Sequence, residues 1–314
     1  MKILVTEPID KQGYEMLEKV GEVIKGTGKD EETVLRESKD VDAILIRVAK
    51  ITEKIITSNP NLKVVAKHGI GVDNIDIKCC TKNGVMVVNA PKSNTNTVAE
   101  HTVSILLAAA KNIPLLDRQT KLSHFGDRSI YPTVELAGKT LGLIGMGNIA
   151  KLVAKKLKGF DLNIIAYDPY VETSEYAEMV KTVDEIYERS DFISLHVPLM
   201  PKTKHMISFE QFAKMKKDVI VVNASRGGTI DEEALYSALE EGTISGAALD
   251  VFESEPPSSD NPLFRLNNVV VSPHNAALSK QALVNMATHA AKGICEVLEG
   301  ETPEWLVNKE LLND

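Results

Sequence analysis

The strongest constraint on the fold is the alternation of short apolar runs, rich in Val and Ile, with longer amphipathic stretches along the chain. Most of these runs are apolar at nearly every position, which is typical of strands that are covered on both faces. The expected strands cover residues 2–5, 43–46, 63–66, 85–88, 140–144, 163–167, 192–195, 219–222, 247–249 and 269–271. Alternating strands and helices predict parallel sheets joined by right-handed crossovers, so the expected fold class is α/β.

Length and composition agree with this fold class and exclude others. A chain of 314 residues has a prior of about two domains, at roughly 150 residues for each. Hydrophobic residues make up 43% of the chain and charged residues 25%, which excludes disordered and collagen-like architectures. The net charge of −8 argues against a broad basic surface, so we expect neither nucleic acid nor a membrane as a partner.

Cysteine usage and the N-terminal sequence indicate a compartment. The adjacent pair Cys79 and Cys80 makes a poor structural disulfide, and no Cys/His spacing indicates zinc. An acid at Glu7 comes too early for the core of a signal peptide. The longest uncharged apolar stretch, residues 102–110, is about half as long as a membrane span. We therefore expect a cytoplasmic protein without a bound metal.

Two long helical segments stand out. The pattern Thr97-x-x-Glu100 predicts a capping box at the start of the first helix, which continues to Ala110. This helix is apolar nearly all round, so we expect it to be buried between other elements. The second helix spans roughly residues 279–298.

A glycine-rich motif follows the strand expected at residues 140–144. Gly145 and Gly147 form Gly-x-Gly-x-x-Ala, in which the first glycine allows a tight turn and the second lets the backbone approach a pyrophosphate. Asp168 ends the next strand, 23 residues after Gly145, where an acid accepts hydrogen bonds from ribose hydroxyls. The alternative is a purely structural glycine turn, which this context disfavours. Because a carboxylate would repel a 2′-phosphate, the sequence predicts NAD rather than NADP.

Two later segments carry candidate catalytic residues at the ends of expected buried strands. Arg226 lies where side chains face the ligand crevice of an open α/β sheet, and it could hold a planar carboxylate. His274 could exchange a proton with a substrate hydroxyl if a carboxylate such as Glu255 raises its pKa and orients it. The spacing does not show that these residues touch, and Arg226 is equally consistent with a surface turn.

The motifs taken together resemble the D-2-hydroxyacid dehydrogenase family. They are Gly-x-Gly-x-x-Ala with Asp168, Asn-Ala-Ser-Arg-Gly-Gly at 223–228, Asp-Val-Phe-x-x-Glu-Pro at 250–256 and Ser-Pro-His at 272–274, with further matches at 69–76 and 195–199. These motifs run in family order from about residue 47 to residue 277. Within the family, the chain is most similar to the D-3-phosphoglycerate dehydrogenases, in a short form without the regulatory extension that many carry.

The resemblance implies a domain organisation and an assembly. It implies two Rossmann-like, doubly wound parallel-sheet domains, with the dinucleotide domain inserted into a discontinuous substrate domain. The substrate domain would cover residues 1–96 and 284–314, and the NAD-binding domain residues 97–283. A homodimer formed through the NAD-binding domain, around residues 111–138, is also implied.

The resemblance further implies roles at the reaction centre. Arg226 would hold the carboxylate and carbonyl of the substrate, Glu255 would support the histidine, and His274 would be the general acid/base. A hydride would pass between the nicotinamide and C2 of a 2-hydroxy or 2-oxo acid. The positions that match cofactor contacts are Gly145, Gly147, Asn148, Ile149, Asp168, His196, Val197, Ala224, Ser225, Arg226, Asp250, His274 and Ala277.

Substrate recognition is the remaining implication of the resemblance. Backbone amides of His68, Gly69 and Ile70 would bind the carboxylate, and Arg47 matches a substrate-contacting position. Arg128 falls where phosphoglycerate dehydrogenases carry a basic residue, and for both arginines a solvated surface position is the alternative. Two cations suit a phosphate, so 3-phosphoglycerate and 3-phosphohydroxypyruvate, in serine biosynthesis, are the first expectation. A hydroxypyruvate, glyoxylate or D-lactate-type reductase is the alternative, and an NAD-sensing regulatory protein is an alternative of a different class.

Overall fold

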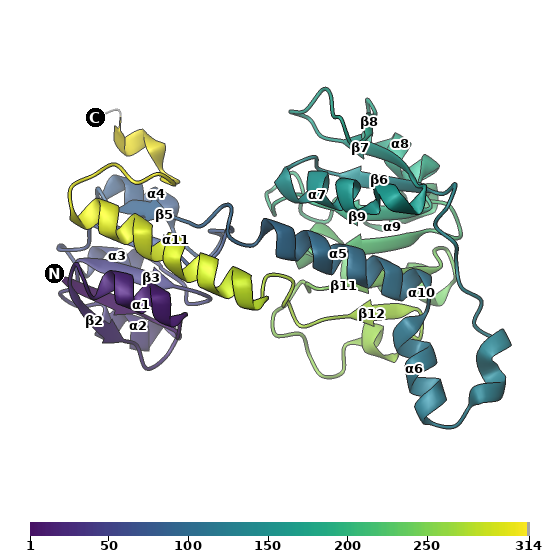
Figure 1. Cartoon of the computed structure of the whole chain (residues 1–314), viewed down its shortest axis with the longest axis horizontal. Coiled ribbons are helices and arrows are strands. Elements are labelled where there is room, and N and C mark those ends of the chain that lie inside the picture. The colour runs from purple at the N-terminus through teal and green to yellow at the C-terminus, as the bar shows by residue number, and fades with distance from the viewer. Residues whose placement is uncertain (313–314) are drawn as a thin grey trace. The chain divides into compact units, whose positions relative to one another are not determined.

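The computed structural model describes residues 1–312, apart from the side chains of residues 127 and 128. The chain divides into two compact units, Met1–Asn94 with Leu278–Asp314, and Thr95–Ala277. Each unit is built around one parallel sheet with helices on both faces (Figure 1). The prediction of an α/β fold with two parallel sheets is therefore confirmed.

The first unit contains a five-stranded sheet in the order β2-β1-β3-β4-β5. Its strands are β1 (Lys2–Val5), β2 (Glu22–Lys25), β3 (Ala43–Ile46), β4 (Val64–Lys67) and β5 (Met86–Val88). The helices α1 (Lys11–Leu17) and α11 (Lys280–Leu298) lie side by side on one face of the sheet (Figure 1). The other face is covered by α2 (Glu31–Glu37), α3 (Glu53–Thr57) and α4 (Ile77–Lys82).

The apolar strands of the first unit contribute side chains to the cores on both faces of the sheet. Ile3 and Val5 of β1 pack in the core beneath α11, whereas Leu4 packs in the core beneath α2 and α3. Successive residues of a strand point to opposite faces, so a strand between two helical layers must be apolar at every position. This is the physical reason for the continuous apolar runs in the sequence.

The second unit contains a seven-stranded sheet in the order β12-β11-β10-β9-β6-β7-β8. Its strands are β6 (Thr140–Ile144), β7 (Asn163–Tyr167), β8 (Glu178–Met179), β9 (Phe192–Leu195), β10 (Ile220–Asn223), β11 (Gly246–Leu249) and β12 (Val269–Val271). The helices α5 (Thr95–Ala110) and α7 (Asn148–Leu157) lie side by side on one face (Figure 1). The other face is covered by α8 (Val183–Arg189), α9 (Phe209–Lys214) and α10 (Glu232–Glu240).

Both sheets contain a point at which the order of the strands reverses. In the first unit this point lies between β1 and β3, and in the second between β6 and β9. In open α/β sheets, ligands bind outside the carboxyl ends of the strands at such a point. The chain leaves β3 at Arg47, β6 at Gly145 and β9 at His196, so predicted site residues lie at both points.

The structure also differs from the sequence prediction in some elements. The strands β2 and β8 were not expected; both are short edge strands, β8 with two residues, and neither has a long apolar run. The capping box at Thr97 is wrong, because α5 already begins at Thr95. Glu100 instead accepts a hydrogen bond from Asn96 Nδ2 (2.8 Å) and forms an ion pair with Lys156 (3.2 Å).

Two kinds of feature are absent from the described residues, a membrane-spanning helix and a cluster of metal ligands. No helix in this part of the chain is both long and apolar enough to cross a bilayer. The same residues contain no group of three or more His, Cys, Asp or Glu side chains that could hold a metal ion.

Candidate active site

The glycine loop lies at the carboxyl end of β6, at the reversal point of the larger sheet. Gly145 has φ +93°, and a Cβ there would lie 2.6 Å from the carbonyl oxygen of His196, so only glycine fits. Gly147 precedes α7, and a Cβ there would meet no described atom within 4 Å. Packing within the protein therefore does not require glycine at position 147. The missing side chain instead leaves space for a ligand at the helix N-terminus.

Asp168 lies directly beside this loop. Its Oδ2 accepts a hydrogen bond from the backbone N–H of Met146 (2.8 Å), and its Oδ1 accepts one from Tyr170 (2.8 Å). The 23-residue spacing in the sequence thus corresponds to a contact between the acid and the loop. The loop, the helix N-terminus and the acid together fit a dinucleotide.

The structure brings the three candidate catalytic residues together. Nδ1 of His274 lies 2.6 Å from Oε2 of Glu255, with the two side chains 48% and 35% exposed. Burial raises the pKa of Glu255, but hydrogen bonds from His274 and from the Phe252 N–H, with the positive charges of His274 and Arg226, bring it below its usual value. Because Nδ1 is bound to the carboxylate, Nε2 is the imidazole nitrogen that can exchange a proton with a substrate.

A buried carboxylate holds the turn that carries His274. His274 has φ +49°, and its N–H donates to the carbonyl oxygen of Asp250 (2.8 Å). The side chain of Asp250 is fully buried and accepts from the N–H groups of Asn275 (3.0 Å) and Ala276 (2.9 Å). Ser272 Oγ also donates to Asp250 (2.6 Å). Asp250 is predicted to contact the cofactor; in the structure its carboxylate fixes the backbone around His274, the candidate catalytic histidine.

His101 of α5 is a further partner of Asp250 that sequence reasoning missed. Its Nε2 lies 3.3 Å from Asp250 Oδ1 and 2.9 Å from Ser272 Oγ. Burial raises the pKa of Asp250, but hydrogen bonds from His101, from Ser272 and from the turn lower it below its usual value. No local pattern in the sequence indicates His101, because it is a single histidine in a helix and its partner Asp250 is distant in the chain.

Arg226 follows β10 and is held by contacts of its backbone. Its carbonyl oxygen accepts from Asn223 Nδ2 (3.0 Å) and Thr229 Oγ1 (2.7 Å). A Cβ at the next residue, Gly227, would lie 1.9 Å from the carbonyl carbon and oxygen of Phe252. The segment that carries Arg226 therefore packs directly on the segment that leads to Glu255.

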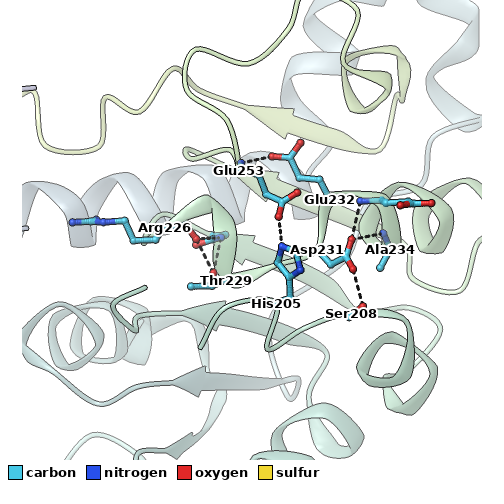
Figure 2. Close-up of polar contacts among 10 residues, drawn as sticks. His205, Ser208, Arg226, Thr229, Asp231, Glu232, Ala234 and Glu253 are labelled. Carbon is cyan, nitrogen blue, oxygen red and sulfur yellow. Dashed lines mark hydrogen bonds and ion pairs between the residues drawn. The ribbon is translucent and has the colours of Figure 1, made fainter. Parts of the chain in front are cut away.

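A second polar network holds the segment that leads to Glu255. The imidazole of His205 pairs with the carboxylate of Glu253, whose N–H donates to Glu232 (Figure 2). The side chain of Asp231 accepts from the N–H groups at the start of α10, and the side chain of Arg226 points away from the His205–Glu253 pair (Figure 2). The sequence did not indicate these residues, because isolated charges on separate loops form no pattern.

The remaining cofactor candidates of the second unit lie around the same sheet edge. His196 Nε2 lies 3.0 Å from Ser194 Oγ, and burial lowers the pKa of His196 to about 4. His196 is therefore neutral near pH 7, which argues against a role as proton donor. The other candidates are half-buried or exposed and lie at the start of α7 or just after β9, β10 and β12: Asn148, Ile149, Val197, Ala224, Ser225 and Ala277.

The substrate candidates of the first unit lie at the carboxyl edge of its own sheet. Arg47 follows β3, and His68, Gly69 and Ile70 follow β4. Burial lowers the pKa of His68 to about 4, and the positive charges of Arg47 and Lys67 contribute. Two cations therefore lie near His68, whose Nε2 has no hydrogen-bond partner among the described residues.

Two further observations concern the basic residues. Lys67, the last residue of β4, was missed by sequence reasoning, because a lysine at the end of an apolar strand is ordinary. Its Nζ donates to the carbonyl oxygen of Arg47 and to Asn74 Oδ1 (2.8 Å). Arg128 falls in the short 3₁₀ helix η1 (Phe125–Ser129), and its side chain lies outside what the structure describes.

A doubly wound sheet with a glycine loop at its reversal point, and a His–Glu pair near the positive charge of an arginine, defines an NAD-dependent dehydrogenase. Residues 103–276 match the NAD-binding domain of the D-isomer-specific 2-hydroxyacid dehydrogenases. The chain belongs to this family.

The relatives of this chain carry the names of different activities. A D-3-phosphoglycerate dehydrogenase from Methanocaldococcus jannaschii is 48% identical over 313 residues, 98% of this chain and 59% of that relative. A glyoxylate reductase from Thermofilum pendens is 40% identical over 324 residues, 99% of this chain and 95% of the relative. The structure of a D-lactate dehydrogenase with NAD⁺ from Lactobacillus jensenii matches with a TM-score of 0.81 at 27% identity, covering 98% of this chain and 100% of that one. This chain spans 59% of the length of the first relative.

Proposed function

We propose that this protein interconverts a D-2-hydroxy acid and its 2-oxo acid with NAD, and that 3-phosphoglycerate and 3-phosphohydroxypyruvate are its preferred pair. The observation that carries the proposal is the 2.6 Å contact between His274 Nδ1 and Glu255 Oε2, near the positive charge of Arg226. A paired imidazole and a guanidinium are the groups that reduction of a 2-oxo acid requires.

The mechanism assigns one task to each residue. The Gly145 loop and Asp168 would hold NAD(H), which would supply or accept the hydride at C2 of the substrate. During reduction His274 Nε2 donates a proton to the carbonyl oxygen, and during oxidation it takes the proton back. The carboxylate of Glu255 stabilises the imidazolium and fixes Nδ1 as its hydrogen-bond donor. The guanidinium of Arg226 binds the substrate carboxylate and polarises the carbonyl group.

We expect Asp168→Asn to weaken NADH binding and to reduce the preference for NADH over NADPH. The carboxylate would accept hydrogen bonds from the ribose hydroxyls, and its charge would repel a 2′-phosphate. Loss of charge-assisted hydrogen bonds predicts an increase of about tenfold in the Kd for NADH, measured by fluorescence titration. The control is Glu172→Gln, an exposed acid on the following loop. Equal Kd values for the wild type and Asp168→Asn would contradict this role.

Two positive charges support the phosphorylated substrate. Arg47 and Lys67 lie near His68 at the edge of the first sheet, where a phosphate group would be attracted. The backbone amides of His68, Gly69 and Ile70 would bind the substrate carboxylate. The relative that is 48% identical carries the name D-3-phosphoglycerate dehydrogenase, which supports the same substrate and a place in serine biosynthesis.

The experiment that tests the proposal follows reduced nicotinamide absorbance with a panel of substrates. NAD is paired with 3-phosphoglycerate, and NADH with phosphohydroxypyruvate, hydroxypyruvate, glyoxylate and pyruvate. We expect the highest kcat/KM for the phosphorylated pair. In Arg47→Ala we expect the KM for phosphohydroxypyruvate to increase by about 10–100-fold, because hydrogen bonds to a charged group are lost. The KM for hydroxypyruvate should change little.

The other outcomes of this panel support different functions. A preference for glyoxylate or hydroxypyruvate would support the second candidate, which the glyoxylate reductase relative at 95% coverage favours. An unchanged KM for phosphohydroxypyruvate in Arg47→Ala would remove the phosphate assignment. Tight NADH binding without turnover of any substrate would instead support an NAD-sensing regulatory protein.

An assembly and a location are part of the proposal. The helix α6 (Ile113–Lys121) and η1 form an arm of the second unit (Figure 1). This arm exposes four large apolar side chains, 56–67% accessible: Ile113, Leu122, Phe125 and Ile130. Clustered exposed apolar residues mark protein interfaces, which supports a homodimer through this segment. The three cysteines form no disulfide, which supports a reducing compartment such as the cytoplasm.

A further inference from the structure

The segment from Arg47 to Ala49 lies at the reversal point of the five-stranded sheet. Arg47 is the first residue after β3, and Glu7 is the second residue after the neighbouring strand β1. The carboxyl ends of these two parallel strands lie side by side, so Glu7 and Arg47, which are 40 residues apart in the sequence, lie close together where an open sheet binds its ligand. Nothing in the candidate active site described above involves Glu7.

The carboxylate of Glu7 accepts hydrogen bonds from consecutive backbone amides of this segment. Oε2 accepts from the N–H of Arg47 (2.9 Å), while Oε1 accepts from Val48 (2.7 Å) and Ala49 (3.0 Å). Thr6 Oγ1 also donates to Glu7. A run of converging N–H groups is a typical anion site, and here it is occupied by a side chain of the protein itself.

The same segment is also held from its other side. Lys67 Nζ donates to the carbonyl oxygen of Arg47, and one guanidinium N–H of Arg47 donates to the carbonyl oxygen of Pro8 (2.9 Å). Among the described residues, no carboxylate forms an ion pair with Arg47. The backbone of Arg47 is therefore fixed at both of its polar groups, while the charge of its side chain is not neutralised by an acid.

We propose that Glu7 is a positioning residue that fixes Arg47 for the phosphate group of the substrate and so determines the preference for phosphorylated over unphosphorylated acids. This inference rests on the proposed function, in which Arg47 contacts the phosphate. Glu7 holds the backbone of Arg47, and Pro8 accepts a hydrogen bond from its guanidinium. A side chain held in this way loses less conformational freedom on binding than a mobile one, so its position contributes to affinity.

The position of Glu7 requires a carboxylate, because both of its oxygens accept hydrogen bonds from the backbone N–H groups of residues 47–49. Burial raises the pKa of Glu7, but the hydrogen bonds from Thr6 and from the amides of residues 47–49 bring it below its usual value. Glu7 is thus ionised near neutral pH. A glutamine side chain has one oxygen and one NH₂ group, and the NH₂ group would face a backbone N–H. Glu7→Gln therefore releases the segment with little change in side-chain volume.

The experiment compares Glu7→Gln, Glu7→Asp and wild-type protein with phosphohydroxypyruvate and with hydroxypyruvate. We expect the KM for phosphohydroxypyruvate to rise about tenfold in Glu7→Gln. The KM for hydroxypyruvate, kcat and the Kd for NADH should change by less than about twofold. Glu7→Asp keeps the charge, so we expect a KM between those of the wild type and Glu7→Gln.

The matched control is Asp42→Asn, which lies at the amino ends of the strands of the same sheet, whereas Glu7 lies at their carboxyl ends. Asp42 precedes β3, accepts a hydrogen bond from the N–H of Lys2 (2.8 Å) and pairs with Lys63 (3.0 Å). This variant also removes a carboxylate that accepts a hydrogen bond from the backbone, but at a place remote from Arg47. We expect a lower Tm in this variant and an unchanged ratio of the two KM values.

The outcomes separate this inference from the proposed function. An equal rise of both KM values in Glu7→Gln, or no rise, would overturn the positioning role. If Arg47→Ala raises the KM for phosphohydroxypyruvate and Glu7→Gln does not, the phosphate assignment stands and the inference about Glu7 fails. If Arg47→Ala has no effect on that KM, the phosphate assignment itself fails.

Discussion

In His274→Asn, kcat for the preferred substrate falls by about 10²–10⁴-fold, the range for loss of a general acid/base. Asparagine is suited to this test because it tolerates positive φ, and His274 has φ +49°. The turn can therefore remain in place while the group that exchanges the proton is removed. The measurement is steady-state kinetics by nicotinamide absorbance, together with NADH titration by fluorescence.

We expect the Kd for NADH to stay within about twofold, because the loop at Gly145 and the acid Asp168 are unaffected. Glu255→Gln is the companion variant: it removes the charge beside Nδ1 and keeps the shape of the side chain. Its kcat should lie between those of wild type and His274→Asn. Turnover of His274→Asn near the wild-type rate would exclude His274 from the mechanism.

Gly227→Ala should produce the second large effect, through packing rather than chemistry. The added Cβ would lie 1.9 Å from the carbonyl carbon and oxygen of Phe252, so one of the two segments must move. Overpacking of this kind costs about 1–3 kcal/mol, which corresponds to a Tm lower by roughly 3–10 °C. Because the two segments carry Arg226 and lead to Glu255, we also expect kcat/KM to fall by about 10²-fold.

The adjacent Gly228 provides a matched control. A Cβ there would meet only the methyl groups of Leu199, at 3.3 and 3.4 Å, and a flexible side chain can adjust to it. Gly228→Ala should therefore keep Tm and kcat/KM near the wild-type values. Differential scanning calorimetry and steady-state kinetics on both variants provide the comparison. Similar behaviour of the two alanine variants would show that the close backbone contact at Gly227 does not control the site.

The central strands could be predicted from sequence because burial on both faces leaves a continuous apolar run. β6 and β7 have the predicted bounds, and β10 is shifted by one residue, to Ile220–Asn223. The strands β2 and β8 contain charged residues and have no fully buried position, so they lack such a run and the sequence does not predict them. The predicted start of α5 is wrong because the pattern Thr97-x-x-Glu100 lies inside the helix, which begins at Thr95, and a capping box forms only at a helix N-terminus.

The candidate site could be predicted in part for a related reason. His274, Glu255 and Arg226 lie within short motifs at the ends of strands, and the parallel sheet brings those ends to one edge. Glu7 and His101 act through residues 40 and 149 positions away in the sequence, namely Arg47 and Asp250. Contacts over such separations depend on the order of strands in the sheet, which no local pattern contains.

The buried carboxylate of Asp250 has a consequence for the second unit as a module. His101 lies in α5, with which this unit begins, and Ala276 is its penultimate residue. Both bind Asp250, at 3.3 and 2.9 Å. A unit inserted into another chain must start and finish at nearby points. One carboxylate holds these two ends together, so residues 95–277 have the closed form that insertion into a host domain requires.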